Sequence, residues 1–376
     1  MQTPPKVVIV GRTNVGKSTL FNALTEKKVA AENYPFCTID PSVGIVAVPD
    51  PRLKVLTELS HSAKTIPAVV EFVDIAGLVK GASEGAGLGN QFLSHIREVD
   101  AIAHVVRIFE DGDIAHVEEG EIDPLRDIGI INLELILADM QTVGKRLGSL
   151  ERDVKRGDKA AVLEHEALAK VDAALAAGKL ARETQLSEKE AQAVQSVHLI
   201  TMKPMLYVLN RKAGGHNLDE MNDPRWHELT AFLDAKLDVR RQVLSKNWVA
   251  VDAAIEGELR DVSFDEKETL RREFGVLDDG IDALIKEAYS LLGLMSYFTT
   301  GRDETRAWTI KVGSTAPEAG ATIHSDFREK FIRADVVSYE QLVEAGSFVK
   351  AREKGKVRTE GKEYVVQEGD VIEFKI

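Results

Sequence analysis

"KVVIVGRTNVGKSTLFNAL", residues 6–24, decides the fold. The stretch opens with a β-branched apolar run, and GRTNVGKST (11–19) then matches the phosphate-loop pattern G-x-x-x-x-G-K-[ST]. Its position between an apolar strand and a helix beginning LFNAL makes the match specific. Gly11 and Gly16 let the loop turn its amide N–H groups inward, and the helix N-terminus adds partial positive charge. The stretch predicts a triphosphate site on an α/β domain.

Oxygen-bearing side chains near this loop predict a magnesium site. Ser18 follows the phosphate-loop lysine, and Asp74 ends an apolar run in a D-x-x-G motif that closes with Gly77. Thr38 is the loop hydroxyl expected to complete Mg²⁺ coordination in the triphosphate state. We expect Lys17 to reach the β and γ oxygens, and the Gly77 amide to sense the γ-phosphate.

The residue after this D-x-x-G motif is not a glutamine. Ras-like enzymes place a Gln there to orient the attacking water, but Leu78 can neither donate nor accept a hydrogen bond. Hydrolysis is therefore either slow or assisted by another group. His116 follows the third apolar run and is the candidate, with a plain solvent-exposed histidine as the alternative. Asn14 could ligate a potassium ion beside the phosphates or simply stabilise the turn.

The stretch LYVLNRKAGG (206–215) stands where a GTP-binding domain reads guanine with Asn-Lys-x-Asp. This chain has Asn210, Arg211, Lys212 and Ala213 there. The missing Asp would accept two hydrogen bonds from guanine, so Ala213 removes most of the discrimination for that base. Backbone C=O and N–H groups near Arg211 could serve adenine instead, and Asn210 could contact N7. We therefore expect ATP as the ligand, while the acidic run NLDE (217–220) remains a competing register.

The composition is that of an ordinary globular protein. The 376 residues suffice for two or three domains, and 29% of them are charged. The apolar run near the start is too short for a signal peptide, and no membrane-spanning run follows, so we expect a cytoplasmic protein without membrane contact. The single cysteine, Cys37, excludes an internal disulfide framework. A net charge of −13 argues against DNA as a partner, although a local basic patch can still contact RNA.

Short β-branched runs alternate with helical stretches, which predicts a mainly parallel sheet with covering helices. These runs are 6–10, 68–74, 101–109, 205–210 and 247–253. Between the third and fourth runs, apolar residues recur at alternating spacings of three and four, the pattern of a coiled coil. They are Leu133, Ile136, Met140, Val143, Leu147, Leu150 and Val154. The turn signal RGDK (156–159) and a second apolar set at Leu168, Val171 and Leu175 predict an antiparallel helical hairpin.

Two basic segments are candidate contacts for an anionic partner. The hairpin tip carries Lys145, Arg146, Arg152, Lys155, Arg156 and Lys159. From about residue 303 strand-like runs indicate a small α+β module, whose segment 349–362 carries Lys350, Arg352, Lys354, Lys356, Arg358 and Lys362. The alternative for both segments is an ordinary solvated surface.

Five stretches together resemble the YchF, or Obg-like ATPase, family of translation-factor-class P-loop NTPases. They are GRTNVGKSTLFNALT (11–25), YPFCTIDPSVGIVAVPDPRL (34–53), FVDIAGLVKGASEGAGLGNQFLSHIRE (72–98), HVVRIFED (104–111) and the tail segment 306–339. The resemblance implies a Ras-like P-loop NTPase domain over 1–130 and 200–302, and a coiled-coil helical insert over 131–199. It also implies a C-terminal TGS domain of ubiquitin-like β-grasp fold over 303–376.

The same resemblance implies hydrolysis of ATP in preference to GTP, Mg²⁺ dependence and association with ribosomes. Its nucleotide-binding residues carry over as Asn14, Val15, Gly16, Lys17, Ser18 and Thr19, together with Asn210 and the backbone at Arg211. Ser18 and Thr38 carry over as Mg²⁺ ligands, and His116 matches a loop histidine proposed to assist hydrolysis. Members usually carry Asn-x-x-Glu at the base site, and Ala213 departs from that pattern. A nucleotide sensor with negligible hydrolysis and an Obg-type GTPase remain as alternatives.

Overall fold

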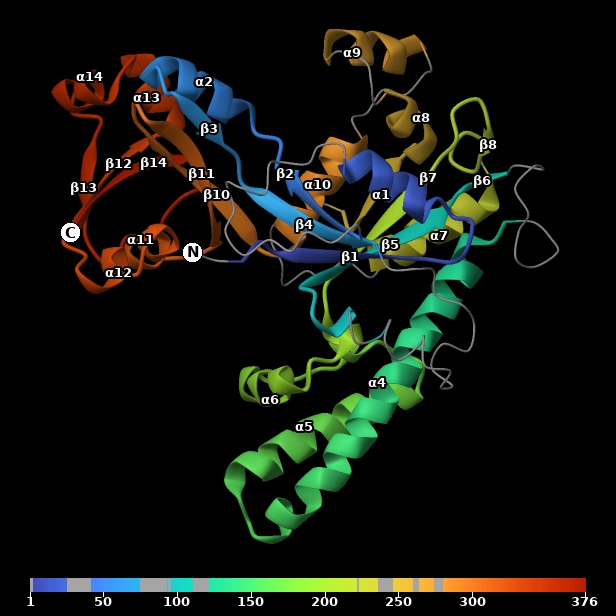
Figure 1. Cartoon of the computed structure of the whole chain (residues 1–376). Helices are drawn as coiled ribbons and strands as arrows, with labels where there is room; N and C mark the ends of the chain where they lie inside the picture. Colours follow the sequence, from blue (N-terminus) through green and yellow to red (C-terminus); the bar gives the residue numbers. More distant parts are fainter. Residues whose placement is uncertain are drawn as a thin grey trace.

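The computed structural model describes residues 3–25, 42–74, 93, 96–110, 122–221, 223–235, 246–259, 264–273 and 280–376. Figure 1 shows a central sheet with helices on both faces, a helical hairpin that projects from it, and a second sheet module that carries the C-terminus.

The central sheet has six strands. Their order is β2 (Val43–Ala47), β4 (Val69–Asp74), β1 (Lys6–Val10), β5 (Ala101–Arg107), β7 (Met205–Asn210) and β9 (Trp248–Val251). β2 runs antiparallel to β4, and every other neighbouring pair is parallel. The five β-branched runs noted in the sequence supply all the parallel strands.

The two faces of the sheet have separate cores, because successive side chains of a strand point to opposite sides. Val7 and Ile9 of β1 pack in one core with α1 (Lys17–Thr25) and α10 (Gly280–Leu291). Val8 and Val10 pack in the other with α4 (Pro124–Lys155) and α7 (Pro224–Ala235). This arrangement confirms the predicted α/β fold of a P-loop domain.

Parallel pairing brings the functional segments to one edge of the sheet. Ile9 lies beside Asp74, and Asn210 lies between Arg107 and Val251. The phosphate loop, Asp74 and the loop after Asn210 therefore leave the same carboxyl edge, where ligands of open α/β sheets bind. Smaller elements at this edge are β6 (Phe109–Glu110), β8 (His216–Asn217) and α8 (Ala253–Glu258), and α9 (Phe264–Glu273) follows along the chain.

The helical hairpin consists of α4 and α5 (Lys159–Ala176), which lie antiparallel in Figure 1. Gly157 turns the chain with a φ of 76°, and the Asp158 carboxylate caps α5 by accepting from the Ala160 and Ala161 N–H groups at 2.9 Å. Ile136, Val143 and Leu150 are buried against α5, as the coiled-coil pattern predicted. The hairpin closes with η3 (Ala181–Glu183), α6 (Glu188–Val194), η4 (Gln195–Val197) and η5 (Ile200–Met202).

Leu133 does not belong to the coiled-coil contact. Its side chain is 53% exposed, whereas the neighbouring Ile131 and Leu135 are buried in the core of the central sheet. The reason is that α4 begins at Pro124, before residue 131, and covers the sheet with its first turns. The helix therefore belongs to both the nucleotide domain and the insert.

The base of the hairpin is fixed by a buried carboxylate. Asp139 of α4 accepts hydrogen bonds from the Ile200 N–H at 2.9 Å and from the N–H and hydroxyl of Thr201 at 2.7 Å each. Nearby, Lys203 Nζ donates to the carbonyls of Arg97 and Val99. The helix that leads into the insert, α4, and the returning segment at η5 are thus joined where they meet the sheet domain.

The second sheet also contains strands from outside the expected tail module (303–376). Its order is β13 (Arg358–Glu360), β12 (Arg333–Ser338), β14 (Asp370–Lys375), β10 (Leu294–Thr300), β11 (Glu304–Lys311) and β3 (Lys64–Ile66). Because β10 pairs along its whole length with β11, the module begins at residue 294 and differs from the expected boundary at 303. Its helices are α11 (Ala316–Ile323), α12 (Asp326–Glu329), α13 (Tyr339–Ala345) and α14 (Phe348–Glu353).

The segment between β2 and β4 also joins this module. It forms α2 (Pro51–Ser60) and β3, which lie beside β10 and β11 in Figure 1. Arg52 makes ion pairs with Asp50 and Glu368, and its guanidinium lies 4.9 Å from the centre of the Phe298 ring. The two sheets are therefore joined by packing as well as by the chain. None of the helices in the described ranges is long and apolar enough to cross a membrane.

Candidate nucleotide-binding site

The phosphate loop has a backbone that only certain residues adopt easily. Gly11, Asn14 and Gly16 have φ angles of 155°, 61° and 95°. Asparagine tolerates the left-handed conformation better than most residues, which accounts for Asn14 without any ligand. The loop then enters α1 at Lys17. The strand–loop–helix context predicted from the sequence is thus present.

Asn210 ties the loop that follows it (211–215, here called the base loop) to the phosphate loop. Its side chain, 5% exposed, donates through Nδ2 to the Val15 carbonyl at 2.9 Å and accepts from the Ala253 N–H at 3.1 Å. A Cβ atom at Gly16 would lie only 2.3 Å from Asn210 Nδ2. Glycine at position 16 is therefore required by this neighbour as well as by its backbone angle.

Lys17 and Asp74 form the charged centre of the site. Lys17 is 7% exposed, and its Nζ donates to the Arg12 carbonyl at 2.5 Å. Burial lowers the pKa of the Lys17 ammonium and raises the pKa of the Asp74 carboxyl, and the attraction between the two charges opposes both shifts. A buried cation at a helix N-terminus is a strong attractor for phosphate oxygens.

The donors around Lys17 fit a magnesium ion. Ser18 contributes a hydroxyl to the lining of the cleft, and Asp74 contributes a carboxylate at the end of β4. Hard oxygen donors of this kind, with room left for phosphate oxygens, are what Mg²⁺ prefers.

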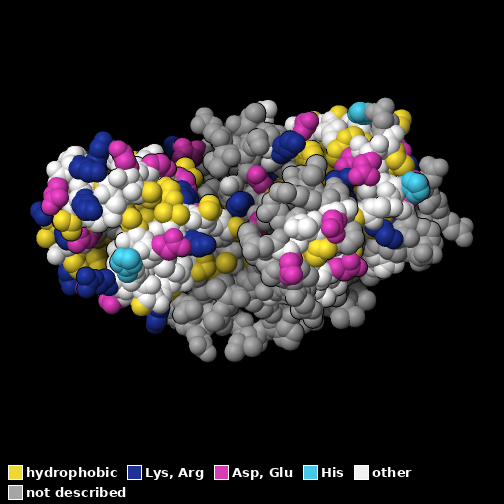
Figure 2. Space-filling view, turned by 90° about the horizontal axis from the view of Figure 1, so that it is seen from above, with side chains coloured by type: hydrophobic (Ala, Val, Ile, Leu, Met, Phe, Trp, Pro, Cys, Tyr) yellow, Lys and Arg dark blue, Asp and Glu magenta, His cyan; other side chains and the backbone are white. Residues whose placement is uncertain are grey.

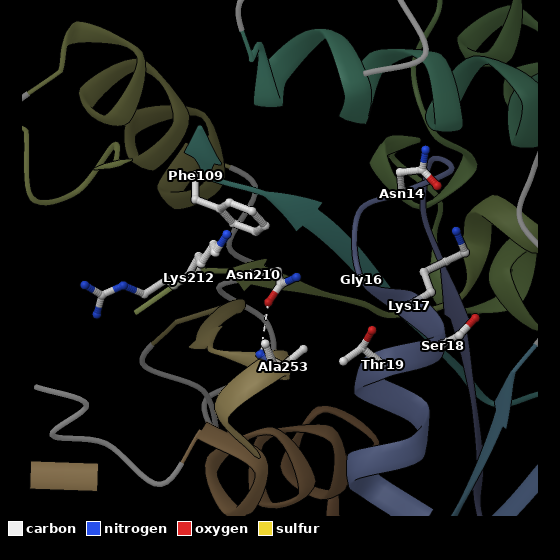
Figure 3. Close-up of a pocket in the computed structure, with 11 residues that line it drawn as sticks. Asn14, Gly16, Lys17, Ser18, Thr19, Phe109, Asn210, Lys212 and Ala253 are labelled. Atoms are coloured by element: carbon white, nitrogen blue, oxygen red, sulfur yellow. Dashed lines mark hydrogen bonds between the residues drawn. The ribbon is translucent and has the colours of Figure 1, made fainter. Parts of the chain in front are cut away.

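A cleft of about 490 Å³ runs from the phosphate loop to the base loop. This volume suits a ligand of nucleotide size. The cleft is lined by Asn14, Gly16, Lys17, Ser18, Thr19, Phe109, Asn210, Arg211, Lys212, Ala253 and Ala254. Figure 3 shows Lys17, Ser18 and Thr19 toward one end, Phe109 and Lys212 toward the other, and Asn210 bonded to Ala253 between them.

Phe109 is held as a flat wall of the cleft. Arg107, 2% exposed, donates from Nε to the Phe109 carbonyl at 2.9 Å, and its guanidinium lies 4.5 Å from the centre of the Phe109 ring. This cation–π contact fixes the ring orientation and leaves the cleft side of the ring for a planar group.

Five backbone N–H groups at the base end of the cleft are bonded to the protein. In the loop, Arg211 N–H donates to the Val251 carbonyl, Lys212 N–H to Asn217 Oδ1 and Ala213 N–H to Asp252 Oδ2. At the start of α8, Ala253 N–H donates to Asn210 Oδ1 and Ala254 N–H to Asp252 Oδ1. The sequence suggested that N–H groups near Arg211 could donate to adenine N1, but these groups already have partners.

Comparisons with known proteins show which family has this arrangement. The protein named "Ribosome-binding ATPase YchF" from Bacillus subtilis is 52% identical over 369 residues, which cover 98% of each chain. The chain belongs to the YchF family. The relative of the same name from Haemophilus influenzae is 45% identical over 98% of both chains. The Schizosaccharomyces pombe YchF GTPase has a solved structure that matches with a TM-score of 0.84 at 36% identity, covering 100% of this chain and 98% of the other.

Two family models divide the chain in the same way. Residues 294–376 match YchF-GTPase_C, described as a protein of unknown function, and residues 6–130 match a model described as a 50S ribosome-binding GTPase. The first match begins at the first residue of β10. It thus supports the module boundary that strand pairing gives.

The structure brings most of the predicted YchF site residues together. Asn14, Gly16, Lys17, Ser18, Thr19, Asn210 and Arg211 line the cleft, and Val15 supplies the carbonyl bonded by Asn210. Thr38, Gly77 and His116 lie outside the described residues, as does Leu78. Their roles remain predictions.

Sequence reasoning missed several residues of the site. Phe109 and Ala253 line the cleft, while Asp252 and Asn217 hold the base loop from behind. The signal that could have found three of them is topological, because Phe109, Asp252 and Ala253 follow the carboxyl ends of β5 and β9. Asn217 has no such signal. It holds the backbone of Lys212, accepting from its N–H and donating to its carbonyl, and its amide also donates to Glu220 Oε2 at 3.1 Å.

Proposed function

We propose that this chain is a ribosome-associated ATPase that binds ATP with Mg²⁺ in the described cleft and hydrolyses it to ADP and phosphate. The names of its relatives from Bacillus subtilis and Haemophilus influenzae support a ribosome-binding ATPase. The cleft supports nucleotide binding, since it combines a phosphate loop with a flat aromatic wall. A cytoplasmic location follows from ribosome association and belongs to the same proposal.

The observation that favours adenine is the hydrogen-bonding state of the base end. Guanine presents an O6 acceptor and needs an N–H donor there, but the five N–H groups of Arg211–Ala213 and Ala253–Ala254 already have protein acceptors. Guanine also needs a carboxylate for its N1–H and 2-amino group, and Ala213 supplies none. Adenine presents a 6-amino donor instead, for which a backbone carbonyl such as that of Arg211 is a suitable acceptor.

We assign the phosphate and metal roles to residues at the other end of the cleft. In this proposal Lys17 binds the β and γ oxygens, and Ser18, Thr38 and Asp74 hold Mg²⁺ directly or through water. The lining of the cleft by Lys17 and Ser18 supports these roles. The metal, when bound, offsets negative charge on the transferred phosphoryl group. Asn14 remains the candidate ligand for a potassium ion, although its backbone conformation also explains its identity.

The proposed hydrolysis differs from that of Ras-like enzymes in its water-orienting group. Leu78 cannot orient water, so the assisting side chain is assigned to His116, with the Gly77 amide on the γ-phosphate. Measured ATP turnover by the purified protein, alone and with ribosomes, tests whether the protein is an ATPase. Turnover in either condition supports an ATPase, and undetectable turnover in both leaves the nucleotide sensor and the Obg-type GTPase as alternatives.

The ribosome contact is assigned to the hairpin tip. There Arg146, Lys155 and Arg156 already pair with Glu164, Glu151 and Asp153 at 2.6, 3.3 and 3.6 Å. Lys145, Arg152 and Lys159 are exposed and make no ion pair within the described residues. Figure 2 shows the basic side chains of the C-terminal module mixed with acidic ones, and the segment 349–362 stays the second candidate contact.

A matched pair of charge reversals tests the tip. Arg152→Glu with Lys159→Glu should weaken co-sedimentation with ribosomes, because RNA phosphates would meet two new negative charges. Lys179→Glu with Lys189→Glu changes the net charge equally on exposed insert residues away from the tip and serves as the control. Equal co-sedimentation of both variants would remove the tip from the contact.

An Obg-type GTPase is the second candidate. It is favoured by the match of residues 6–130 to the model described as a 50S ribosome-binding GTPase. The missing acid at position 213 opposes it. Titration with both nucleotides decides between the two.

A further inference from the structure

Asp252 is the acidic residue that the base loop lacks in its own sequence. It lies between β9 and α8, and its side chain is 5% exposed. One carboxylate oxygen, Oδ1, accepts from the Ala254 and Ile255 N–H groups at 3.1 and 3.0 Å. The other, Oδ2, accepts from the Ala213 N–H. A single buried carboxylate thus joins the base loop to the helix that forms the opposite wall of the cleft.

Capping α8 does not require both oxygens. An N-cap side chain satisfies the first free N–H groups of a helix through one acceptor, and Ser or Asn does this as well as Asp. The second oxygen of Asp252 is directed away from the helix, at the one residue of the loop where a guanine-reading acid would stand. Helix capping alone therefore does not account for the contact with Ala213.

This contact places a negative charge next to any acid at position 213. A hydrogen-bonded oxygen lies about 3 Å from the donor nitrogen, and Cβ of residue 213 is two bonds from that nitrogen. A carboxylate at 213 would therefore lie within about 6 Å of the Asp252 carboxylate, a range in which like charges oppose each other's ionisation. Ala213 is partly buried and Asp252 is buried, so screening between the two charges would be weaker than between exposed groups.

We propose that Asp252 is a positioning residue that determines base selectivity, by fixing the loop through Ala213 N–H and by excluding an acid from position 213. In this chain the acid next to the base site is Asp252, at the start of α8, and position 213 of the loop carries Ala. At the start of α8 the acid does not face the hydrogen-bond donors of guanine. This inference rests on the proposed nucleotide function and names the group that sets its selectivity.

The inference predicts that the guanine-reading acid cannot be restored by one substitution. We would titrate non-hydrolysable ATP and GTP analogues with Mg²⁺ into the nucleotide-free parent and into A213D, D252N and the double variant A213D/D252N. In A213D the GTP-analogue affinity should change by less than about threefold, because the new carboxylate faces Asp252. In the double variant it should exceed that of A213D by about tenfold or more, because the side-chain amide introduced at position 252 can donate to the new carboxylate.

A second double variant guards against an effect of the new amide. A213D/D252S keeps a helix cap but places no side-chain group on residue 213. It should also gain GTP-analogue affinity over A213D, while D252N alone should not, because Ala213 still offers no acceptor for guanine. If Asp252 only capped the helix, replacing it would lower thermal stability. The effect of A213D on GTP-analogue affinity would then be the same with and without the change at position 252.

The outcomes separate this inference from the proposed function. A full gain of GTP-analogue affinity in A213D alone, or no gain in either double variant, overturns the role of Asp252. The ATP preference of the parent is read from the parent titration only. If the parent preferred GTP, the proposed ATPase would fail, while the dependence of position 213 on residue 252 could still be confirmed.

Discussion

At the scale of single residues, Gly16 is the position where phosphate binding and base binding meet. Its Cα faces the Asn210 side chain, which itself holds the Val15 carbonyl. A change at residue 16 would therefore disturb both loops together.

The first prediction concerns Gly16→Ala. The new Cβ would lie 2.3 Å from Asn210 Nδ2, at a φ of 95° that alanine rarely adopts. We expect ATP-analogue affinity to fall by about 10- to 100-fold, the equivalent of about 1–3 kcal/mol of strain. Gly148→Ala is the control, since no atom lies within 4 Å of that exposed helical position. It should leave affinity unchanged and raise stability by about 1 kcal/mol. Normal affinity in a folded G16A variant would contradict the packing described here.

The second prediction concerns His104, which is buried in β5 with its ring centre 5.5 Å from that of Tyr207. Burial, with smaller contributions from Arg182 and Lys17, lowers the pKa of His104 from 6.5 to about 3. Below pH 6.5 the unfolded chain binds a proton that the folded chain does not, so stability falls as pH is lowered toward 3. The loss from this group is about 1.4 kcal/mol per pH unit.

His104→Phe should remove that component. Urea-denaturation midpoints of the parent and the variant at about pH 7 and about pH 5, on either side of the unfolded-state pKa, measure it. The parent should lose more stability than the variant between the two values. An identical loss in both would show that His104 does not titrate differently on folding.

The residues that the sequence predicts at the site are those of contiguous motifs. Lys17 and Ser18 could be assigned because their spacing from Gly11 and Gly16 is fixed by phosphate geometry. Asp252 could not, because it acts on the backbone of a loop 39 positions away, and any side chain at 213 offers it the same N–H.

At the scale of elements, α4 packs against two different partners along its length. Its first part covers the central sheet, and its second part forms the hairpin with α5. The repeat of apolar residues predicts the hairpin correctly from Ile136 onward. It fails at Leu133 because the partner changes from a helix to a sheet, and the side of the helix that is buried changes with it.

The third prediction tests the junction of these two environments. Asp139→Ala would leave the N–H groups of Ile200 and Thr201 without their acceptor in a buried site. We expect a loss of about 3 kcal/mol in local stability, measured by hydrogen exchange of these two amides. Asp153→Ala removes an exposed carboxylate from the same helix and should change exchange little. Equal protection in both variants would contradict a fixed junction.

At the scale of the whole molecule, the two sheets share the segment between β2 and β4. α2 and β3 are connected in sequence to the nucleotide domain but pack against the C-terminal module. This could not be predicted from the sequence, because β3 has only three residues and no repeating pattern, and its partner β11 lies far along the chain. The same lack of a local signal explains the shift of the module boundary from 303 to 294.

The fourth prediction tests this connection through Arg52, which contacts Asp50, Glu368 and the Phe298 ring. Arg52→Ala should cost about 1–2 kcal/mol, because the guanidinium is only partly exposed to solvent. Hydrogen exchange should then accelerate in α2 and β10 together. Arg328→Ala, a change on the short surface helix α12, is the control. Faster exchange in α2 alone would mean that the two parts are not joined through this residue.

We propose that this YchF-family cleft selects adenine, because five N–H groups at its base end already have protein acceptors and position 213 carries no acid. The most direct test is calorimetric titration of the nucleotide-free protein with ATP and GTP analogues in Mg²⁺. The structure predicts that the ATP analogue binds about tenfold more tightly or better, a difference of about 1.4 kcal/mol. Equal affinities, or tighter binding of the GTP analogue, would contradict the claim.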